Sequence, residues 1–224
     1  DENLEENLEF YNKSFLRGMA RKDGVPVLRI AAQHDGITKE AGLKLPEERF
    51  NGLAAELEIA EGARVILIHN VAVELGLMNG TRGVVRQIVF EKGRGPNHED
   101  PKRRMPIVIV VEFPQYDGPR FFDEPDRVTW VPLRLAERSD GSDRGVVRKQ
   151  FPLVLGWAMT PWKAQGMTLD RAIVRLNKAA SSPGVAFVAL SRVRHPDHLM
   201  LEDSFRDMAT IMKQSGKDSF HARQ

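Results

Sequence analysis

The hydrophobic and polar positions follow a helical period at the start of the chain. Between residues 3 and 19 the apolar residues recur every three or four positions, at Leu4, Leu8, Tyr11 and Phe15, which predicts an amphipathic helix. A short apolar run at residues 25–32 predicts a buried strand. The polar residues that follow, through Glu40, are expected to form a loop, and residues 46–57 a second short helix.

The middle of the chain has the pattern of short strands. Two β-branched runs, residues 64–68 and 84–90, are separated by Asn79-Gly80, which is the strongest short hairpin signal. Residues 105–113 and 127–133 continue the pattern. We expect residues 58–148 to form a small twisted barrel of short strands.

A third pattern begins after residue 150. The apolar run at residues 151–159, broken only by Gly156, predicts a strand that is buried on both faces, as in a parallel sheet. Beyond it we expect a strand at 171–176, a helix at 183–194 that begins at Ser182-Pro183, a strand at 198–202 and a last helix from Asp203. The β-rich module is therefore predicted to be an insertion inside an α/β domain.

Composition narrows the possible partners. The 224 residues are 42% hydrophobic and carry 33 Lys and Arg against 31 Asp and Glu, so the net charge says little. Between residues 144 and 175, however, Asp170 is the only acid among six basic residues, Arg144, Arg148, Lys149, Lys163, Arg171 and Arg175. A polyanion would be attracted there. The lack of cysteine excludes disulfides and thiolate zinc sites. The sequence has no leader pattern and no apolar run of about 18 residues, so we expect neither secretion nor a membrane partner.

The loop after residue 159 has the chemistry of a phosphate site. Thr160 and Gln165 can donate hydrogen bonds, Lys163 supplies a charge, and Gly166 lets a backbone approach closely. Open α/β sheets place ligands beyond the carboxyl ends of their strands. A solvated loop that merely caps a strand is the alternative.

The predicted helix at 183–194 carries a second candidate. Arg192 lies four residues after Val188, a predicted packed position, so its guanidinium can be held rigidly toward a phosphate in the way that an arginine finger requires. A surface arginine that lays its stem along the helix is the alternative.

Two segments together resemble the fifth and sixth helicase motifs of the Pif-type superfamily-one DNA helicases: QFPLVLGWAMTPWKAQGMTLD and GVAFVALSRVR. The segments GARVILIHN and NGTRGVV resemble the start of that family's Src-homology-3-like barrel insert. The resemblance covers about residues 10–201. It implies an α/β fold, in which a RecA-like parallel-sheet domain is split by the small β-barrel. The implied division is 1–57 and 149–202 for the second RecA-like domain, 58–148 for the barrel and 203–224 for a C-terminal helix.

The resemblance also implies roles for individual residues. Arg192 would reach the γ-phosphate of ATP bound to the first RecA-like domain of the same protein, and Gln165 and Gly166 would lie near that nucleotide. Thr160 and Lys163 would contact the phosphates of single-stranded DNA. ATP and Mg²⁺ would be held mainly by the first RecA-like domain, and the motor would unwind DNA in the 5'-to-3' direction.

The loop departs from the family pattern in two places. Pro161-Trp162 stands where the family commonly has Ile-His, and Ala164 stands where a Ser is usual. The missing His removes one phosphate contact. Trp162 can stack on a base or pack under the loop.

One required motif is missing from the sequence. No G-x-x-x-x-G-K-[ST] occurs in the 224 residues, so we expect this chain alone to be inactive and the first RecA-like domain to lie upstream. A non-catalytic, helicase-derived module that binds nucleic acid or protein is the alternative function. His195 and His198 lack a third ligand, so we expect a turn there and no metal.

The expected setting follows from the resemblance. The partner would be single-stranded or forked DNA, and the protein would be a monomer. It would act in DNA repair, DNA recombination and telomere maintenance. We expect an intracellular location, which would be the nucleus or mitochondrion in a eukaryote and the cytoplasm in a bacterium.

Overall fold

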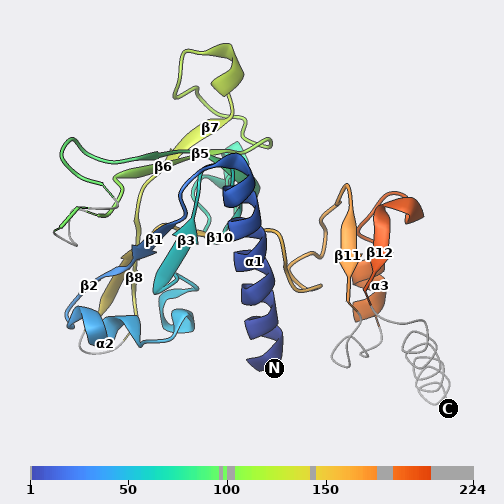
Figure 1. The fold of residues 1–224 in the computed structure, drawn as a ribbon, viewed down its shortest axis with the longest axis horizontal. Helices are drawn as coiled ribbons and strands as arrows, with labels where there is room; N and C mark the ends of the chain where they lie inside the picture. Colours follow the sequence, from blue (N-terminus) through green and yellow to red (C-terminus); the bar gives the residue numbers. More distant parts are fainter. Residues whose placement is uncertain (1, 96–97, 100–103, 142–144, 176–183, 203–224) are drawn as a thin grey trace. The chain divides into compact units, whose positions relative to one another are not determined.

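The chain divides into two compact units, residues 1–158 and 159–224. The computed structural model describes residues 2–95, 98–99, 104–141, 145–175 and 184–202 (Figure 1). No helix among these residues is both long enough and apolar enough to cross a membrane.

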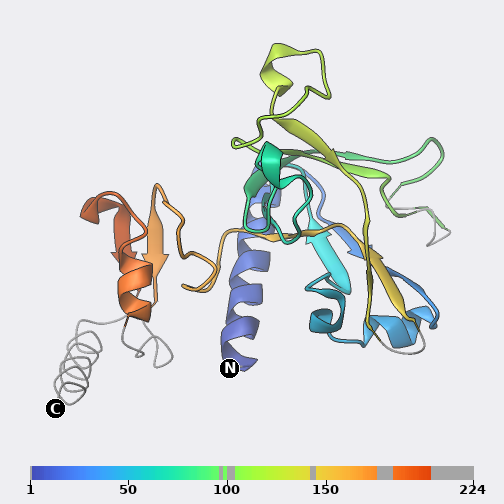
Figure 2. The same ribbon diagram turned by 180° about the vertical axis from the view of Figure 1, so that it is seen from behind.

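Helix α1 (Glu2–Asp23) opens the first unit and confirms the predicted amphipathic helix. Its buried side is defined by Leu16 and Ala20, which are 0% and 4% exposed, whereas Phe15 is 48% exposed. Residues four apart lie on one face of a helix, so these two side chains enter the core together. The helix runs beside β3 (Glu56–Ile59) and β10 (Leu153–Leu155) in both views (Figures 1 and 2).

The largest described sheet of the first unit is antiparallel and has five strands, in the order β10-β4-β5-β6-β7. Its other strands are β4 (Arg64–Leu67), β5 (Arg82–Val89), β6 (Val108–Glu112) and β7 (Trp130–Leu133). The four runs predicted as strands from the β-branched pattern are therefore strands. The Asn79-Gly80 turn lies in the connection between β4 and β5, where Gly80 adopts a φ of +94°.

The prediction of a parallel strand at residues 151–159 was wrong. Only Leu153–Leu155 form a strand, β10, and it pairs antiparallel with β4. An apolar run indicates that a strand is buried on both faces, but it does not indicate whether the neighbouring strand is parallel or antiparallel. Here the neighbour belongs to the β-rich module, so this segment lies within the first unit.

Two further predictions before residue 58 were wrong. The stretch before Glu40 contains β2 (Gln33–Asp35) and the start of α2 (Lys39–Leu43) rather than a loop alone. The predicted helix at 46–57 is reduced to the 3-10 helix η1 (Glu47–Phe50), followed by β3. Asn51 and Gly52 have φ of +53° and +80°, and two successive left-handed residues end a helix.

The remaining strands of the first unit form two small sheets. Strand β1 (Leu28–Ala31) pairs antiparallel with β3. Strands β2, β9 (Val147–Gln150) and β8 (Ala136–Ser139) form an antiparallel sheet with β9 in the centre. The strand at residues 25–32 is thus confirmed, although it is shorter than predicted.

Arg148 on β9 is completely buried, which contradicts its place in the predicted polyanion-binding stretch. Its guanidinium donates to the carbonyls of Leu53, Gly42 and Leu45 at 2.8–2.9 Å. It also lies 4.1 Å from the ring centre of Phe50. The side chain therefore joins α2 and the loops at Leu45 and Leu53 to the central strand of its sheet, and it supplies donors to buried backbone carbonyls.

The second unit contains a β-α-β arrangement. Strand β11 (Ala172–Val174) pairs in parallel with β12 (Leu199–Leu201), and α3 (Val185–Leu190) lies between them in sequence. The two predicted strands are confirmed, and their parallel pairing is the kind expected of an α/β domain. Val174 and Ala189 are the buried residues of a small core between strand and helix.

The helix predicted at 183–194 is shorter than expected. It ends at Leu190, because the backbone at Ser191 leaves the helical region with φ −79° and ψ 5°. Gly184 occupies the N-cap position. The predicted cap at Ser182-Pro183 and the predicted last helix from Asp203 lie outside the described residues.

Candidate functional site

The loop from Thr160 to Met167 is a tight, helix-like turn. The amide of Ala164 donates to the carbonyl of Thr160 at 3.1 Å, and the amide of Met167 donates to the carbonyl of Ala164 at 3.0 Å. The hydroxyl of Thr160 accepts from the amide of Lys163 at 3.3 Å, as an N-cap residue does. The turn is therefore held by its own backbone and by Thr160.

The exposed side chains of this turn are the predicted site residues. Trp162, Lys163 and Gln165 are exposed, whereas Ala164 is 5% exposed. The small Ala164 anchors the turn inside the unit, so its neighbours face outward. Trp162 is 55% exposed, so it does not pack under the loop.

Gly166 ends the turn in a left-handed conformation. Its φ is +79°, and a Cβ built there would meet nothing within 4 Å. The requirement for glycine is thus conformational rather than steric. The space beside Gly166 is open, and the close approach of a ligand to its backbone stays a prediction.

Arg192 is fixed by three hydrogen bonds at the end of α3. Its Nε donates to the carbonyl of Val188 at 2.7 Å, its Nη1 to the carbonyl of Met167 at 3.3 Å, and its Nη2 to the hydroxyl of Ser191 at 2.8 Å. The side chain is half-buried. A guanidinium has five N–H groups, so two remain for a ligand, without an acceptor among the described residues.

The backbone joins the same two segments. The amide of Leu169 donates to the carbonyl of Arg192 at 2.8 Å, and Leu169 pairs in parallel with Val193. The structure thus brings Arg192 to the Gly166-Met167 end of the loop. It shows no contact of Arg192 with Thr160, Trp162 or Lys163.

The contact with Met167 was not predicted from the sequence. A backbone carbonyl leaves no signal in a side-chain pattern, so no motif could have identified it. The contact with Val188 had a signal, because residues four apart face each other on a helix. The sequence therefore pointed to the packed neighbour of Arg192 but not to its partner across the unit.

The two histidines form a turn, as predicted. Residues 196–198 make a single 3-10 turn, and Nδ1 of His195 accepts from the amide of Asp197 at 3.3 Å. Among the described residues, no three His, Cys, Asp or Glu side chains come together as a metal site would require.

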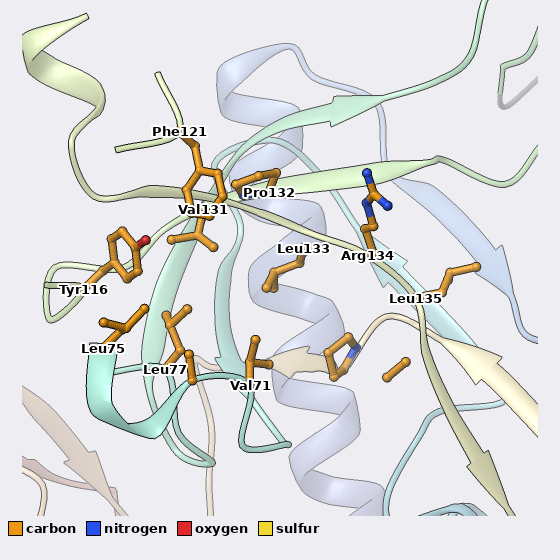
Figure 3. Close-up of a pocket in the computed structure, with 13 residues that line it drawn as sticks. Val71, Leu75, Leu77, Tyr116, Phe121, Val131, Pro132, Leu133, Arg134 and Leu135 are labelled. Atoms are coloured by element: carbon orange, nitrogen blue, oxygen red, sulfur yellow. The ribbon is translucent and has the colours of Figure 1, made fainter. Parts of the chain in front are cut away.

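The first unit contains an apolar pocket that is separate from the predicted site residues. It lies between η2 (Val73–Leu75), the turn at Tyr116 and strand β7, and Val131 and Leu133 form part of its wall (Figure 3). None of the predicted site residues lines it. It therefore adds no support to the phosphate-binding interpretation.

Comparison with known proteins gives the chain a family. The profile of the DNA helicase Pif1 2B domain matches residues 49–88. The ATP-dependent DNA helicase PIF6 of Trypanosoma brucei brucei is 37% identical over 156 residues, which cover 69% of this chain and 17% of that protein. The human ATP-dependent DNA helicase PIF1 is 30% identical over 204 residues, which cover 81% of this chain and 28% of that protein.

Solved structures share the fold. The crystal structure of Pif1 helicase from Candida albicans superposes with a TM-score of 0.61 at 23% identity, and covers 93% of this chain and 47% of that one. The structure of Pif1 helicase from Bacteroides in complex with ADP-AlF3 and single-stranded DNA also gives a TM-score of 0.61, at 22% identity. This match covers 96% of this chain and 44% of that one.

These matches make the chain a homologue of ATP-dependent DNA helicases. It belongs to the Pif1 helicase family. It spans less than a third of the length of these two curated relatives, 17% of the trypanosome protein and 28% of the human one.

Proposed function

We propose that this chain is the C-terminal motor half of an ATP-dependent 5'-to-3' DNA helicase, and that it supplies the arginine finger and part of the groove for single-stranded DNA. In this proposal residues 1–57 and 149–202 form the second RecA-like domain, 58–148 form a Src-homology-3-like barrel whose sheet is completed by β10, and 203–224 form a C-terminal helix. The match of residues 49–88 to the Pif1 2B domain supports an inserted module in this region.

The observation that carries the proposal is the fixed guanidinium of Arg192. Its Nε bond to the carbonyl of Val188, 2.7 Å long, holds the side chain against α3 while two N–H groups remain for an acceptor. A positive charge that is held in advance costs little reorganisation when negative charge develops on a transferred phosphoryl group. Arg192 is therefore suited to act on a nucleotide held by another domain.

The loop gives this finger a connection to DNA. Nη1 of Arg192 donates to the carbonyl of Met167 at 3.3 Å, so the position of the guanidinium and that of the Gly166 end of the loop depend on each other. Thr160 and Lys163 at the other end bind DNA phosphates, and the exposed ring of Trp162 stacks on a base. The nucleotide state and the affinity for single-stranded DNA are thus coupled through one short turn.

The rest of the nucleotide site is not in this chain. No P-loop occurs in the sequence, and the described residues offer no cluster of acids for Mg²⁺. In this proposal ATP and Mg²⁺ would be held mainly by the first RecA-like domain, and the bound metal would supply positive charge beside the phosphates there. What this chain supplies is Arg192 at the γ-phosphate, with Gln165 and Gly166 near the nucleotide.

The proposed substrate is single-stranded or forked DNA, and the proposed working unit is a monomer. The Bacteroides structure contains single-stranded DNA by its description, and another matching structure describes unwinding at forked duplex DNA by two Pif1 helicases. These statements concern those proteins and support the substrate class proposed here.

A matched pair of tailed duplexes tests the unwinding activity and its direction. The complete protein is mixed with ATP and a duplex that carries either a 5' or a 3' single-stranded tail of equal length and sequence. Unwinding of the 5'-tailed duplex alone is expected. Unwinding of the 3'-tailed duplex alone would refute the direction, and binding of both without ATP hydrolysis would favour the non-catalytic module.

A further inference from the structure

Asn12 on α1 holds the backbone at the end of the first unit. Its Oδ1 accepts from the amides of Trp157 and Ala158, at 3.0 and 2.8 Å, and its Nδ2 donates to the carbonyl of Ala158 at 2.9 Å. The partners lie 145 and 146 residues away in sequence. One side chain thus satisfies three backbone groups of two neighbouring residues.

These backbone groups have left the sheet. The last sheet bond of this segment joins the amide of Gly156 to the carbonyl of Arg64, at 2.9 Å. Trp157 and Ala158 belong to no described strand, and Asn12 supplies the hydrogen-bond partners that a neighbouring strand would supply. Buried or half-buried amides need such partners, so Asn12 fixes the path of the chain at Trp157 and Ala158.

The DNA-binding turn of the proposed function begins two residues later, at Thr160. The same turn carries Lys163, and its first hydrogen bond is made by the carbonyl of Thr160. A turn that starts from a fixed backbone loses less conformational freedom on binding than one that starts from a mobile one.

We propose that Asn12 is a positioning residue for the DNA-binding turn at residues 160–166. It touches neither DNA nor nucleotide; it holds the backbone from which the turn starts. The inference rests on the proposed function of Thr160 and Lys163, and it adds a residue of the N-terminal helix that no motif identified.

The helix stays docked without this side chain, so the inference can be tested by substitution. Leu16 and Ala20 are buried in the core, and Arg17 and Lys13 pair with Glu58 at 3.3 and 3.8 Å. These contacts hold α1 independently of Asn12. Removing the Asn12 amide therefore releases residues 157–158 while α1 keeps its packing.

The test measures binding of a fluorescent oligothymidylate to the full 224-residue chain, with thermal unfolding as a check of folding. Asn12→Ala is expected to weaken binding about five- to tenfold, which is the cost of ordering the released backbone at residues 157–158 from which the turn starts. Asn12→Asp keeps the acceptor oxygens and is expected to recover most of that loss. Ser14→Ala, an exposed site on the same helix, is the matched control and is expected to bind as the unmodified chain does.

A double mutant separates positioning from general damage. If Asn12 acts through the turn, Asn12→Ala combined with Lys163→Ala weakens binding by less than the product of the two single effects. Independent, multiplicative effects would overturn the inference, as would unchanged binding by Asn12→Ala when Lys163→Ala weakens binding. If the unmodified chain does not bind the oligonucleotide, the proposed function fails, and this inference fails with it.

Discussion

Nη1 of Arg192 donates to the carbonyl oxygen of Met167 at 3.3 Å, although 25 residues separate them. This bond joins the end of α3 to the turn that begins at Thr160. The two helicase-like motifs of the sequence are therefore in direct contact within the second unit. A change at either motif is expected to affect the other.

Lys163 is expected to contribute one phosphate contact. Lys163→Ala should weaken binding of oligothymidylate and lower the slope of log K against log salt by about 0.7, the value for one contact on a single strand. Fluorescence anisotropy at several salt concentrations measures this slope. Lys39→Ala, an exposed lysine on α2, is the control. A slope that equals that of the unmodified chain would remove Lys163 from the groove.

Arg148 is expected to be a main source of stability in the first unit. Arg148→Met removes the donor of three carbonyl groups, those of Leu53, Gly42 and Leu45, and should lower the free energy of unfolding by about 3–5 kcal/mol. Urea unfolding measures the change. The control is the neighbouring Lys149→Met, which removes the ion pairs with Asp35 and Glu137 and should cost far less, because such pairs are screened by solvent. Equal effects of the two substitutions would contradict this account.

The stability of the first unit should decrease in mild acid because of His34. Nε2 of His34 accepts from Nε of Arg148 at 2.9 Å, which requires a neutral ring. Burial lowers the pKa of His34 below its usual 6.5, the charge of Arg148 lowers it further, and Asp35 opposes both. The folded protein then binds fewer protons than the unfolded chain, so the free energy of unfolding falls as the pH drops below about 6.5.

Urea unfolding between pH 7.5 and 5.5 tests the role of His34. His34→Gln keeps an acceptor but cannot titrate, so its stability should depend less on pH. A residual dependence is expected from His69, because burial also lowers the pKa of His69. Identical pH profiles for the two proteins would show that His34 is not the group responsible.

Periodicity and turn signals predicted the elements that are determined by residues close together in sequence. The spacing around Tyr11 indicated α1, and Asn79-Gly80 indicated the turn before β5. The strand direction at residues 153–155 was missed, because it is decided by β4, a partner far away in sequence. Arg148 was misinterpreted for the same reason: its carbonyl partners lie about a hundred residues earlier, and a stretch of basic residues in a sequence suggests a surface.

The residues of the candidate site stay a prediction from the sequence, and their contacts in the structure could not be predicted from it. Motif spacing selected Lys163 and Arg192, which lie on an exposed turn and at a helix end. The side chain of Asn12 and the carbonyl of Met167 were missed, since backbone contacts follow from the path of the chain and leave no residue pattern. Their discovery depended on the structure.

Gly76, in the connection between β4 and β5, is expected not to tolerate a residue with a side chain. A Cβ there would lie 2.2 Å from the carbonyl oxygen of Gln115, at a φ of +79°. Gly76→Ala should therefore lower the free energy of unfolding by about 2–4 kcal/mol, from backbone strain and overpacking together. Gly93→Ala has nearly the same φ, +78°, but open space around it, and should cost about 1 kcal/mol. Thermal or urea unfolding that gave equal losses would contradict the close packing at Gly76.

The most direct test of the arginine finger is the DNA-stimulated ATPase activity of the complete protein with Arg192→Ala. The turnover number should fall by a factor of about 10³ to 10⁵ while ATP binding stays nearly intact, because the guanidinium acts mainly on charge that develops during phosphoryl transfer. Arg194→Ala, an exposed arginine two residues later, should retain normal turnover. Turnover by Arg192→Ala that equals that of the unmodified protein would contradict the proposed role of this chain.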